Sequence, residues 1–342
     1  MKEVVVVSGA RTAVGNFGGS LKDVPLVKLG ALAIREVLKK AGLKPVIQKE
    51  IAGMAPDVFK GMGMVDLEKS YSQWEGAREE VQVDEVIMGN VLQSGHGQNP
   101  GRQAMIYGGI PKETPAFTLN KLCASGLKAI ALGAQTIQGG EAEVVIAGGM
   151  ENMSQTPYAF PMGRWGARMN NQPMVDLMIF DGLLETFYGY HMGLTAENIA
   201  ERYGITRKEQ DEMGLLSHQR ARAAIQKGIF KEEIVPVKIP QKKGDPIVFE
   251  VDERPMDTSL EKMGKLGTAF KEKGTVTAGN ASGINDAAAA LLLMSREKAR
   301  ALNLEPMGKI VAYSSAGVDP AYMGLGPIPA VRKVLKKTGE YF

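Results

Sequence analysis

The single cysteine of this 342-residue chain, Cys123, is the strongest chemical signal in the sequence. Residues 114–120 form an apolar run typical of a short strand that ends in a turn, and residues 123–137 carry apolar side chains at helical spacing. Cys123 is therefore expected where a strand leads into a helix. The N-terminus of a helix favours the thiolate, the nucleophilic form of cysteine. The alternative is a buried cysteine that packs as a small hydrophobic residue, which is the commoner fate of a lone cysteine.

The elements that must position Cys123 are strands and helices in alternation, which predicts an α/β fold with parallel strand pairing. We expect strands at residues 4–7, 83–88, 143–147, 287–294 and 309–313, and helices at 26–40, 196–203, 208–227 and 327–337. Glycine follows the helices at Gly42, at Gly139 with Gly140, and at Gly339, as it often does past a helix C-terminus. The same order of strand, small-residue turn, proline, helix and glycine occurs in residues 4–42 and 309–339, which by itself is a weak sign of a repeat.

Composition and charge exclude several classes of protein. One cysteine excludes a disulfide framework and fits a reducing cytoplasm, where we expect this protein. The three histidines lie far apart and show no metal-ligand spacing, so no metal is expected. A net charge of +3 is too weak to indicate a nucleic-acid partner. The longest apolar run, residues 287–294, is too short to span a bilayer and predicts a buried strand, so no membrane association is expected.

Long segments of the chain resemble the thiolase family. Residues 120–130, Asn-Lys-Leu-Cys-Ala-Ser-Gly-Leu-Lys-Ala-Ile, are similar to the segment that carries the family's nucleophile. The resemblance continues in ordered matches over most of the chain, at residues 97–104, 147–154, 188–193, 275–286, 317–320 and 324–329. The form with His191 before Met192 and Gly193 resembles the biosynthetic, acetoacetyl-CoA type more than the long-chain degradative type.

The resemblance implies a layered αβαβα fold of two related halves with an inserted loop domain. We assign residues 1–153 to the N-terminal half with the nucleophile, 154–275 to the loop domain that binds coenzyme A, and 276–342 to an incomplete C-terminal half. Residues 52–80 do not match the family pattern and are interpreted as an insertion. A surface excursion without a catalytic role is the simplest interpretation of that insertion, and its methionines offer the alternative of a covered pocket or a subunit contact. The family also implies a homodimer or homotetramer.

The chemistry that the resemblance implies is reversible acyl transfer and Claisen condensation. Cys123 would accept the acetyl group of one acetyl-CoA, and a second acetyl-CoA would attack that thioester to give acetoacetyl-CoA and free coenzyme A. Coenzyme A is part of the substrate, so no separate cofactor is expected. The matching positions for substrate and coenzyme A contacts are Leu183, His191, Met192, Lys262, Ala278, Gly279 and Ser282. A lone histidine more often serves packing, and Ser282 also suits a tight turn.

Three catalytic features of the family do not occur in these 342 residues: an Asn-Glu-Ala-Phe segment, a Gly-His-Pro segment and a second cysteine in a glycine-rich loop. Claisen chemistry needs a base for the α-proton and donors for the enolate, which one thiolate does not supply. We therefore expect the remaining groups outside this chain, in a C-terminal part or in a second polypeptide. Two alternatives stay open, a longer-chain 3-ketoacyl-CoA thiolase and a non-catalytic or complementing subunit that binds coenzyme A.

Overall fold

The computed structural model describes residues 1–340 and divides into two compact units. The first unit contains residues 1–155, 231–251 and 285–310, and the second contains residues 156–230, 252–284 and those from 311 onward. The three-part division of the sequence into two halves and a loop domain remains a prediction.

A seven-stranded mixed sheet forms the centre of the first unit, in the order β15-β1-β14-β7-β5-β6 with β2 paired to one end of β14. Its strands are β1 (Val4–Arg11), β2 (Gly15–Asn16), β5 (Glu85–Gly89), β6 (Ala116–Leu119), β7 (Val144–Asn152), β14 (Asn285–Ser295) and β15 (Gly308–Lys309). Strands were expected at each of these places except β2, and the strong apolar runs are confirmed as strands.

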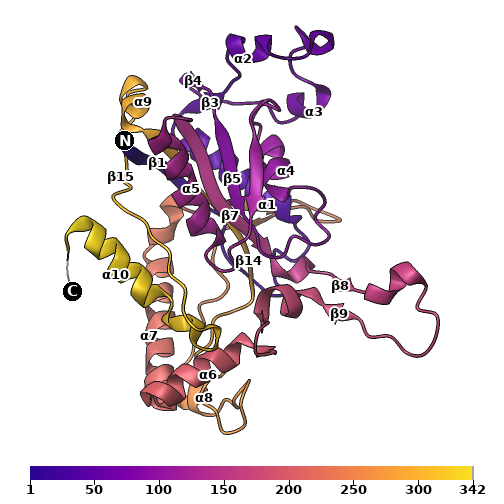
Figure 1. Ribbon diagram of the computed structural model, residues 1–342, viewed down its shortest axis with the longest axis vertical. Helices are drawn as coiled ribbons and strands as arrows, with labels where there is room; N and C mark the ends of the chain where they lie inside the picture. The colour runs from indigo at the N-terminus through magenta and orange to yellow at the C-terminus, as the bar shows by residue number, and fades with distance from the viewer. Residues whose placement is uncertain (341–342) are drawn as a thin grey trace. The chain divides into compact units, whose positions relative to one another are not determined.

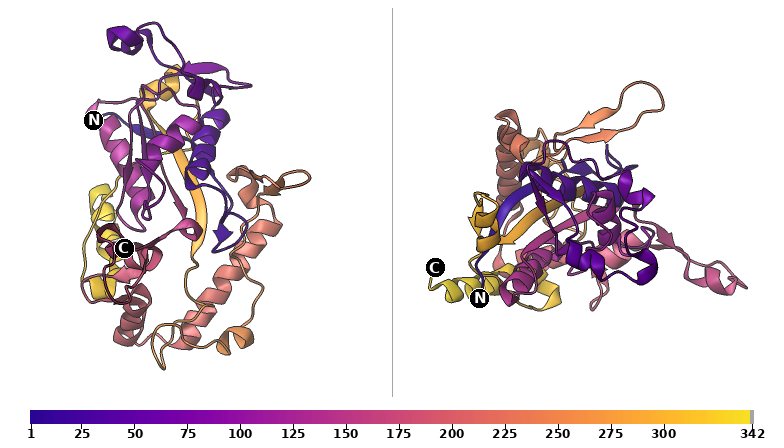
Figure 2. Two further views of the ribbon diagram at one scale, coloured as in Figure 1. Left: turned by 90° about the vertical axis from the view of Figure 1, so that its right-hand side faces the viewer. Right: turned by 90° about the horizontal axis from the view of Figure 1, so that it is seen from above.

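The longest strand, β14, corrects the expected pairing. It is antiparallel to both of its neighbours, β1 and β7, whereas β5 is parallel to β6 and β7. The prediction of parallel pairing is therefore right for β5 and wrong for β14, because that strand returns from the second unit's segments and not from a helical crossover. The sequence division placed residues 285–295 in the C-terminal half, but the strand lies at the centre of this sheet (Figure 2).

Helices cover both faces of the sheet (Figure 1). Helices α1 (Leu26–Lys40) and α4 (Pro100–Tyr107) pack together on one face, and α5 (Ser125–Gly139) packs against β5 and β7 on the other. The apolar stripe of α1 is buried, with Leu29, Ala33 and Val37 all inaccessible to solvent, as its spacing predicts. Gly140 ends α5 in the left-handed conformation, which confirms the predicted glycine stop.

The segment interpreted as an insertion is mostly irregular, with the short helices α2 (Lys49–Gly53), η1 (Asp57–Phe59) and α3 (Asp66–Lys69). Its second part is anchored to the helical layer: the Arg35 guanidinium lies 4.3 Å from the Trp74 ring and donates to the carbonyl of Tyr71. The first unit also contains β3 (Leu43–Pro45), β4 (Glu79–Val81), η2 (Met153–Gln155), β12 (Val237–Ile239), β13 (Ile247–Phe249) and α9 (Arg296–Ala301).

The second unit is built mainly from helices and short hairpins. Helices α6 (Met192–Tyr203) and α7 (Arg207–Gln226) confirm the helices expected at residues 196–203 and 208–227 within a few residues. The other elements are β8 (Tyr158–Ala159), η3 (Pro161–Trp165), β9 (Val175–Asp176), η4 (Met178–Leu183), β10 (Leu184–Glu185), β11 (Tyr190–His191), α8 (Leu260–Gly264), η6 (Pro320–Leu325) and α10 (Pro327–Thr338). The short helix η5 (Ile229–Glu232) spans the boundary between residues 230 and 231 where the chain passes from one unit to the other.

The strand expected at residues 309–313 is shorter than predicted. Only Gly308 and Lys309 form β15, paired with Val6 and Val5 of β1. The amide of Ile310 still donates to the carbonyl of Val4, where β1 begins, so the ladder ends there for lack of further partner strand. Among the helices of residues 1–340, none combines the length and the apolar character needed to cross a membrane.

Gly89, the last residue of β5, permits the close approach of α5 to the sheet. A Cβ at Gly89 would lie 2.5 Å from the carbonyl carbon of Ser125 and 2.6 Å from the amide nitrogen of Gly126.

We predict that Gly89→Ala lowers the free energy of unfolding by about 1–3 kcal/mol, because the start of α5 must shift to make room for the added Cβ. Urea denaturation measures the change. The control is Gly139→Ala at the last residue of α5, where no atom lies within 4 Å of an added Cβ and a small stabilisation is expected. Equal stabilities of the two variants would contradict the prediction.

Candidate active site

Cys123 is exposed and lies between β6 and α5 in the first unit. The helix begins at Ser125 with Ala124 as its N-cap residue, two residues later than the sequence predicts. The cause is a turn before the helix: both the amide and the hydroxyl of Ser125 donate to the carbonyl of Leu122, at 2.9 and 2.6 Å. Cys123 therefore lies immediately before the N-terminus of α5 and is exposed there.

Leu122, directly before the cysteine, has a φ of +49°. A branched residue in this left-handed region is strained, and such strain persists only where neighbouring contacts fix the backbone. The amide of Leu122 donates to Oδ1 of Asn120 at 2.8 Å, and its carbonyl accepts from Ser125. The chain thus makes a sharp, doubly held turn that presents Cys123 to solvent. This geometry suits a nucleophile better than a packing residue.

His191 and Met192 lie in the second unit, where β11 leads into α6. The Nδ1 atom of His191 accepts the amide of Gly193 at 3.0 Å and caps the helix, and the imidazole stacks on the Phe270 ring with centroids 4.5 Å apart. Burial lowers the pKa of His191, which keeps the ring neutral near pH 7 and fits an accepting Nδ1. Gly193 is needed here, because a Cβ would lie 2.2 Å from the Phe270 ring. Leu183 is half-buried and precedes Leu184, which pairs with His191.

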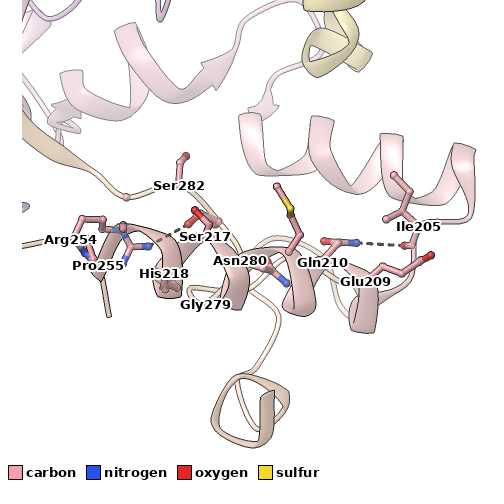
Figure 3. A pocket seen from close by; sticks show the side chains of 15 residues that line it. Ile205, Glu209, Gln210, Ser217, His218, Arg254, Pro255, Gly279, Asn280 and Ser282 are labelled. Atoms are coloured by element: carbon pink, nitrogen blue, oxygen red, sulfur yellow. Dashed lines mark hydrogen bonds between the residues drawn. The ribbon is translucent and has the colours of Figure 1, made fainter. Parts of the chain in front are cut away.

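A pocket of about 580 Å³ lies between α7 and two loops of the second unit. Gly279 and Ser282 line it, as do two residues that the sequence did not indicate, His218 and Arg254 (Figure 3). Figure 3 shows His218 and Arg254 at one end and Gln210 at the other. Burial and the nearby Arg254 lower the pKa of His218, while a hydrogen bond with the backbone of Gly279 opposes the shift.

The other predicted contacts take different places in the second unit. Ala278 is exposed beside the pocket, and its carbonyl accepts from Arg254 at 3.4 Å. Lys262 is exposed on α8 and is not part of the pocket lining. Leu183, His191 and Met192 are outside that lining as well. The structure therefore brings Gly279 and Ser282 together in one pocket and groups Leu183 with His191 and Met192 around β10, β11 and α6.

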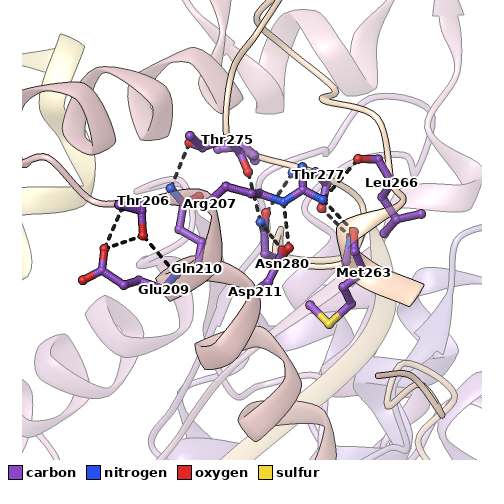
Figure 4. A network of polar contacts seen from close by, with 12 residues as sticks. Thr206, Arg207, Glu209, Gln210, Asp211, Met263, Leu266, Thr275, Thr277 and Asn280 are labelled. Carbon is purple, nitrogen blue, oxygen red and sulfur yellow. Dashed lines mark hydrogen bonds and ion pairs between the residues drawn. The ribbon is translucent and has the colours of Figure 1, made fainter. Parts of the chain in front are cut away.

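Buried polar contacts hold the 275–280 loop that forms one wall of this pocket. Glu197, which is 3% exposed, accepts the amides of Thr275 and Val276 and the hydroxyl of Thr275, all at 2.8–2.9 Å. Asn280 donates to Asp211 at 2.9 Å, and Arg207 pairs with Asp211 at 2.8 Å (Figure 4). The loop is thereby fixed to both α6 and α7.

Comparison with known proteins decides the family. The model of the thiolase N-terminal domain matches residues 4–64 and 75–297. The chain belongs to the thiolase family. The ten residues that this match leaves out, 65–74, fall inside the segment interpreted as an insertion. The bounds of the insertion remain a prediction.

Several named thiolase relatives share about half of the residues. An acetyl-CoA acetyltransferase of Syntrophomonas wolfei is 51% identical over 340 residues, covering 99% of this chain and 77% of the relative. One of Pseudomonas aeruginosa is 50% identical, covering 99% and 78%. A probable acetyl-CoA acyltransferase of Staphylococcus aureus is 48% identical, covering 99% and 77%.

A solved structure shows the thiolase fold. The crystal structure of the Bacillus anthracis acetyl-CoA acetyltransferase has a TM-score of 0.86 at 39% identity and covers 100% of this chain and 78% of that one. The expectation that a C-terminal part is missing remains a prediction, as does the role of each site residue.

Sequence reasoning missed His218, Arg254, Glu197 and Phe270. Arg254 and Phe270 lie in irregular segments where no periodicity marks a side chain as facing inward. A signal did exist for Glu197, an acidic residue on the same helical face as the buried Ala200. Buried carboxylates usually have several donors, so this placement could have indicated a polar network around α6.

The Glu197 network yields a stability prediction with a matched control. We expect Glu197→Gln to lower the free energy of unfolding by about 1–3 kcal/mol, because one carboxylate oxygen becomes an amide donor that faces the Thr275 amide. The control, Glu201→Gln, lies one turn later on α6 and breaks only an exposed ion pair with Lys271, so no measurable change is expected. Urea unfolding of both variants measures the difference. A Glu197→Gln variant with the same free energy of unfolding as the wild type would contradict the role assigned to the network.

Proposed function

We propose that this thiolase is an acetyl-CoA C-acetyltransferase that works through an acetyl group on Cys123. The observation that carries the proposal is the exposed cysteine on the strained turn before α5. The names of the Syntrophomonas wolfei and Pseudomonas aeruginosa relatives, each about half identical to this chain, support acetyl-CoA as the substrate.

The first half-reaction needs a nucleophile and an oxyanion site. The thiolate sulfur of Cys123 attacks the carbonyl carbon of acetyl-CoA, the carbon–sulfur bond to coenzyme A breaks, and coenzyme A leaves as the thiol after taking a proton. We assign the backbone N–H of Cys123 as one donor to the oxyanion that forms.

The second half-reaction removes an α-proton from another acetyl-CoA, and the resulting carbanion attacks the carbonyl carbon of acetyl-Cys123. The bond between that carbon and the Cys123 sulfur breaks, which gives acetoacetyl-CoA and regenerates the free Cys123 thiolate. This step needs a base and enolate donors, and the family segments that would supply them do not occur in the 342 residues. We propose that these groups come from outside these residues, from further residues of the protein or from a second polypeptide.

Coenzyme A is assigned to the second unit. The pocket lined by Gly279, Ser282, His218 and Arg254 combines backbone groups, a hydroxyl and a cation, which suits the polar parts of the coenzyme. We assign Ala278 and Leu183 to the same ligand, His191 and Met192 to the acyl end, and Lys262 to a weaker phosphate contact. A homodimer or homotetramer in the cytoplasm is part of the same proposal, and no separate cofactor is included.

Two other functions remain candidates. The Staphylococcus aureus relative is named a probable acetyl-CoA acyltransferase, a name that states no chain length and is compatible with a longer-chain 3-ketoacyl-CoA thiolase. A complementing subunit that binds coenzyme A without thiolysis accounts for the motifs that do not occur in the sequence.

Kinetics with 3-ketoacyl-CoA substrates of different length test the proposal. We expect thiolysis with the largest kcat/KM for acetoacetyl-CoA, and Cys123→Ser to lower it on the order of 10⁴-fold because the nucleophile is lost. The assay follows the consumption of each substrate in the presence of coenzyme A. A preference for longer chains would favour the 3-ketoacyl-CoA thiolase. Binding of coenzyme A without turnover, restored by a co-purifying polypeptide, would favour the complementing subunit.

A further inference from the structure

Glu151 is a half-buried carboxylate in the first unit that the acyl-transfer chemistry does not use. It lies next to the carboxyl end of β7, and its two oxygens accept the amides of Val91 and Leu92, each at 2.9 Å. The side-chain amide of Asn90 donates to the same carboxylate at 2.7 Å. Burial raises the pKa of Glu151, and these three donors oppose that shift.

The loop that Glu151 holds, residues 90–92, follows β5 and is connected to the nucleophile by one side chain. Asn120 donates its Nδ2 to the carbonyl of Val91 at 3.3 Å and accepts the amide of Leu122 with its Oδ1 at 2.8 Å. Leu122 is the strained residue before Cys123. An unbroken chain of hydrogen bonds thus runs from Glu151 through Val91 and Asn120 to the residue that sets the direction of Cys123.

The orientation of Asn90 supports a specific arrangement around this carboxylate. Asn90 is fully buried, and its Nδ2 donates both to Glu151 and to the carbonyl of Met150. Its Oδ1 is buried without a hydrogen-bond partner among residues 1–340. A buried acceptor without a hydrogen bond lowers the stability of the fold. The two hydrogen bonds that the Asn90 Nδ2 donates to Met150 and Glu151 of β7 must therefore compensate for this loss.

We propose that Glu151 is a positioning residue for Cys123, acting through the 90–92 loop and Asn120. The carboxylate fixes the Val91 carbonyl, Asn120 is thereby held in place, and its Oδ1 stabilises Leu122 in the left-handed conformation that places the thiol before α5. The inference rests on the proposed role of Cys123 as the nucleophile. It makes Glu151 important for the reactivity of a residue that it does not touch.

A matched control is Asp84, which lies directly before β5 and whose carboxylate accepts backbone amides at the start of β7. Asp84 is also half-buried, and one of its oxygens accepts the amides of Glu143 and Val144, at 2.7 and 2.9 Å. Like Glu151, it attaches a neighbouring segment to β7 through two backbone amides. No hydrogen bond from Asp84 leads towards Cys123 in the part of the chain described. A purely structural carboxylate is therefore expected to behave like Asp84.

The test is the second-order rate constant for alkylation of Cys123 by iodoacetamide, followed by intact mass in folded protein. Because Cys123 is the only cysteine, each added group reports on it alone. We expect Glu151→Ala and Asn120→Ala each to lower this rate constant about tenfold. This corresponds to an increase of about 1.4 kcal/mol in the activation free energy of alkylation. Asp84→Ala is expected to lose stability without a change in the rate. The double variant Glu151→Ala, Asn120→Ala is expected to be no slower than either single variant, because both interrupt one chain of contacts.

An unchanged or higher alkylation rate constant in Glu151→Ala would overturn the proposal. It would also be overturned if the rate reduction in the double variant equalled the product of the two single reductions. Should Glu151→Ala not fold, Glu151→Gln keeps the size and one acceptor, and a partial loss of rate is expected. Alkylation by iodoacetamide does not require coenzyme A. The alkylation rates of the variants relative to the wild type therefore do not depend on whether the protein is an acetyltransferase. Failure of the wild-type protein to take an acetyl group from acetyl-CoA would instead count against the proposed function.

Discussion

The first unit depends on how closely the N-terminus of α5 can approach the ends of β5 and β7. This approach is possible because glycines occupy the contact: Gly89 lies under Ser125, and a Cβ at Gly149 would lie 3.3 Å from the Cα of Gly126. Larger side chains would lift the helix and move its positive end away from Cys123. The position of Cys123 thus depends on this backbone packing and on the turn at Leu122, whose φ of +49° lies in the left-handed region.

The rest of the structure serves to fix that contact. Strand β14 joins β1 to β7 with antiparallel pairs along nearly its whole length, and it contributes Ala288, Ala290, Leu292 and Met294 to the hydrophobic core. In the second unit the same device appears at smaller scale, where Glu197 and Asp211 tie the 275–280 loop to two helices. In both units a carboxylate, the half-buried Glu151 or the buried Glu197, accepts several backbone amides of a loop beside a candidate site. Such loops can be precise without regular hydrogen bonding because the donors converge on one rigid acceptor.

Much of this could be read from the sequence. The periodicity of residues 26–40 correctly predicted helix α1, and the apolar run at 287–294 correctly predicted strand β14. The sequence segment around Cys123, residues 120–130, indicated the family. The antiparallel direction of β14 could not be predicted, because it depends on a partner 140 residues away and on where the chain re-enters the sheet. Arg254 and His218 were missed for a similar reason: a pocket made by α7 and two loops has no spacing along the chain. The roles of Leu183, His191, Met192 and Lys262 are still predictions.

The central claim is that Cys123 is the residue that carries the acyl group. The most direct measurement is peptide mapping by mass spectrometry after brief incubation of the protein with acetyl-CoA. Cleavage after Lys121 and Lys128 isolates the peptide Leu122–Lys128, which contains the only cysteine. The account predicts one acetyl group on that peptide, labile to added coenzyme A and absent from Cys123→Ser. An unmodified peptide, or acetyl groups on lysines alone, would contradict it.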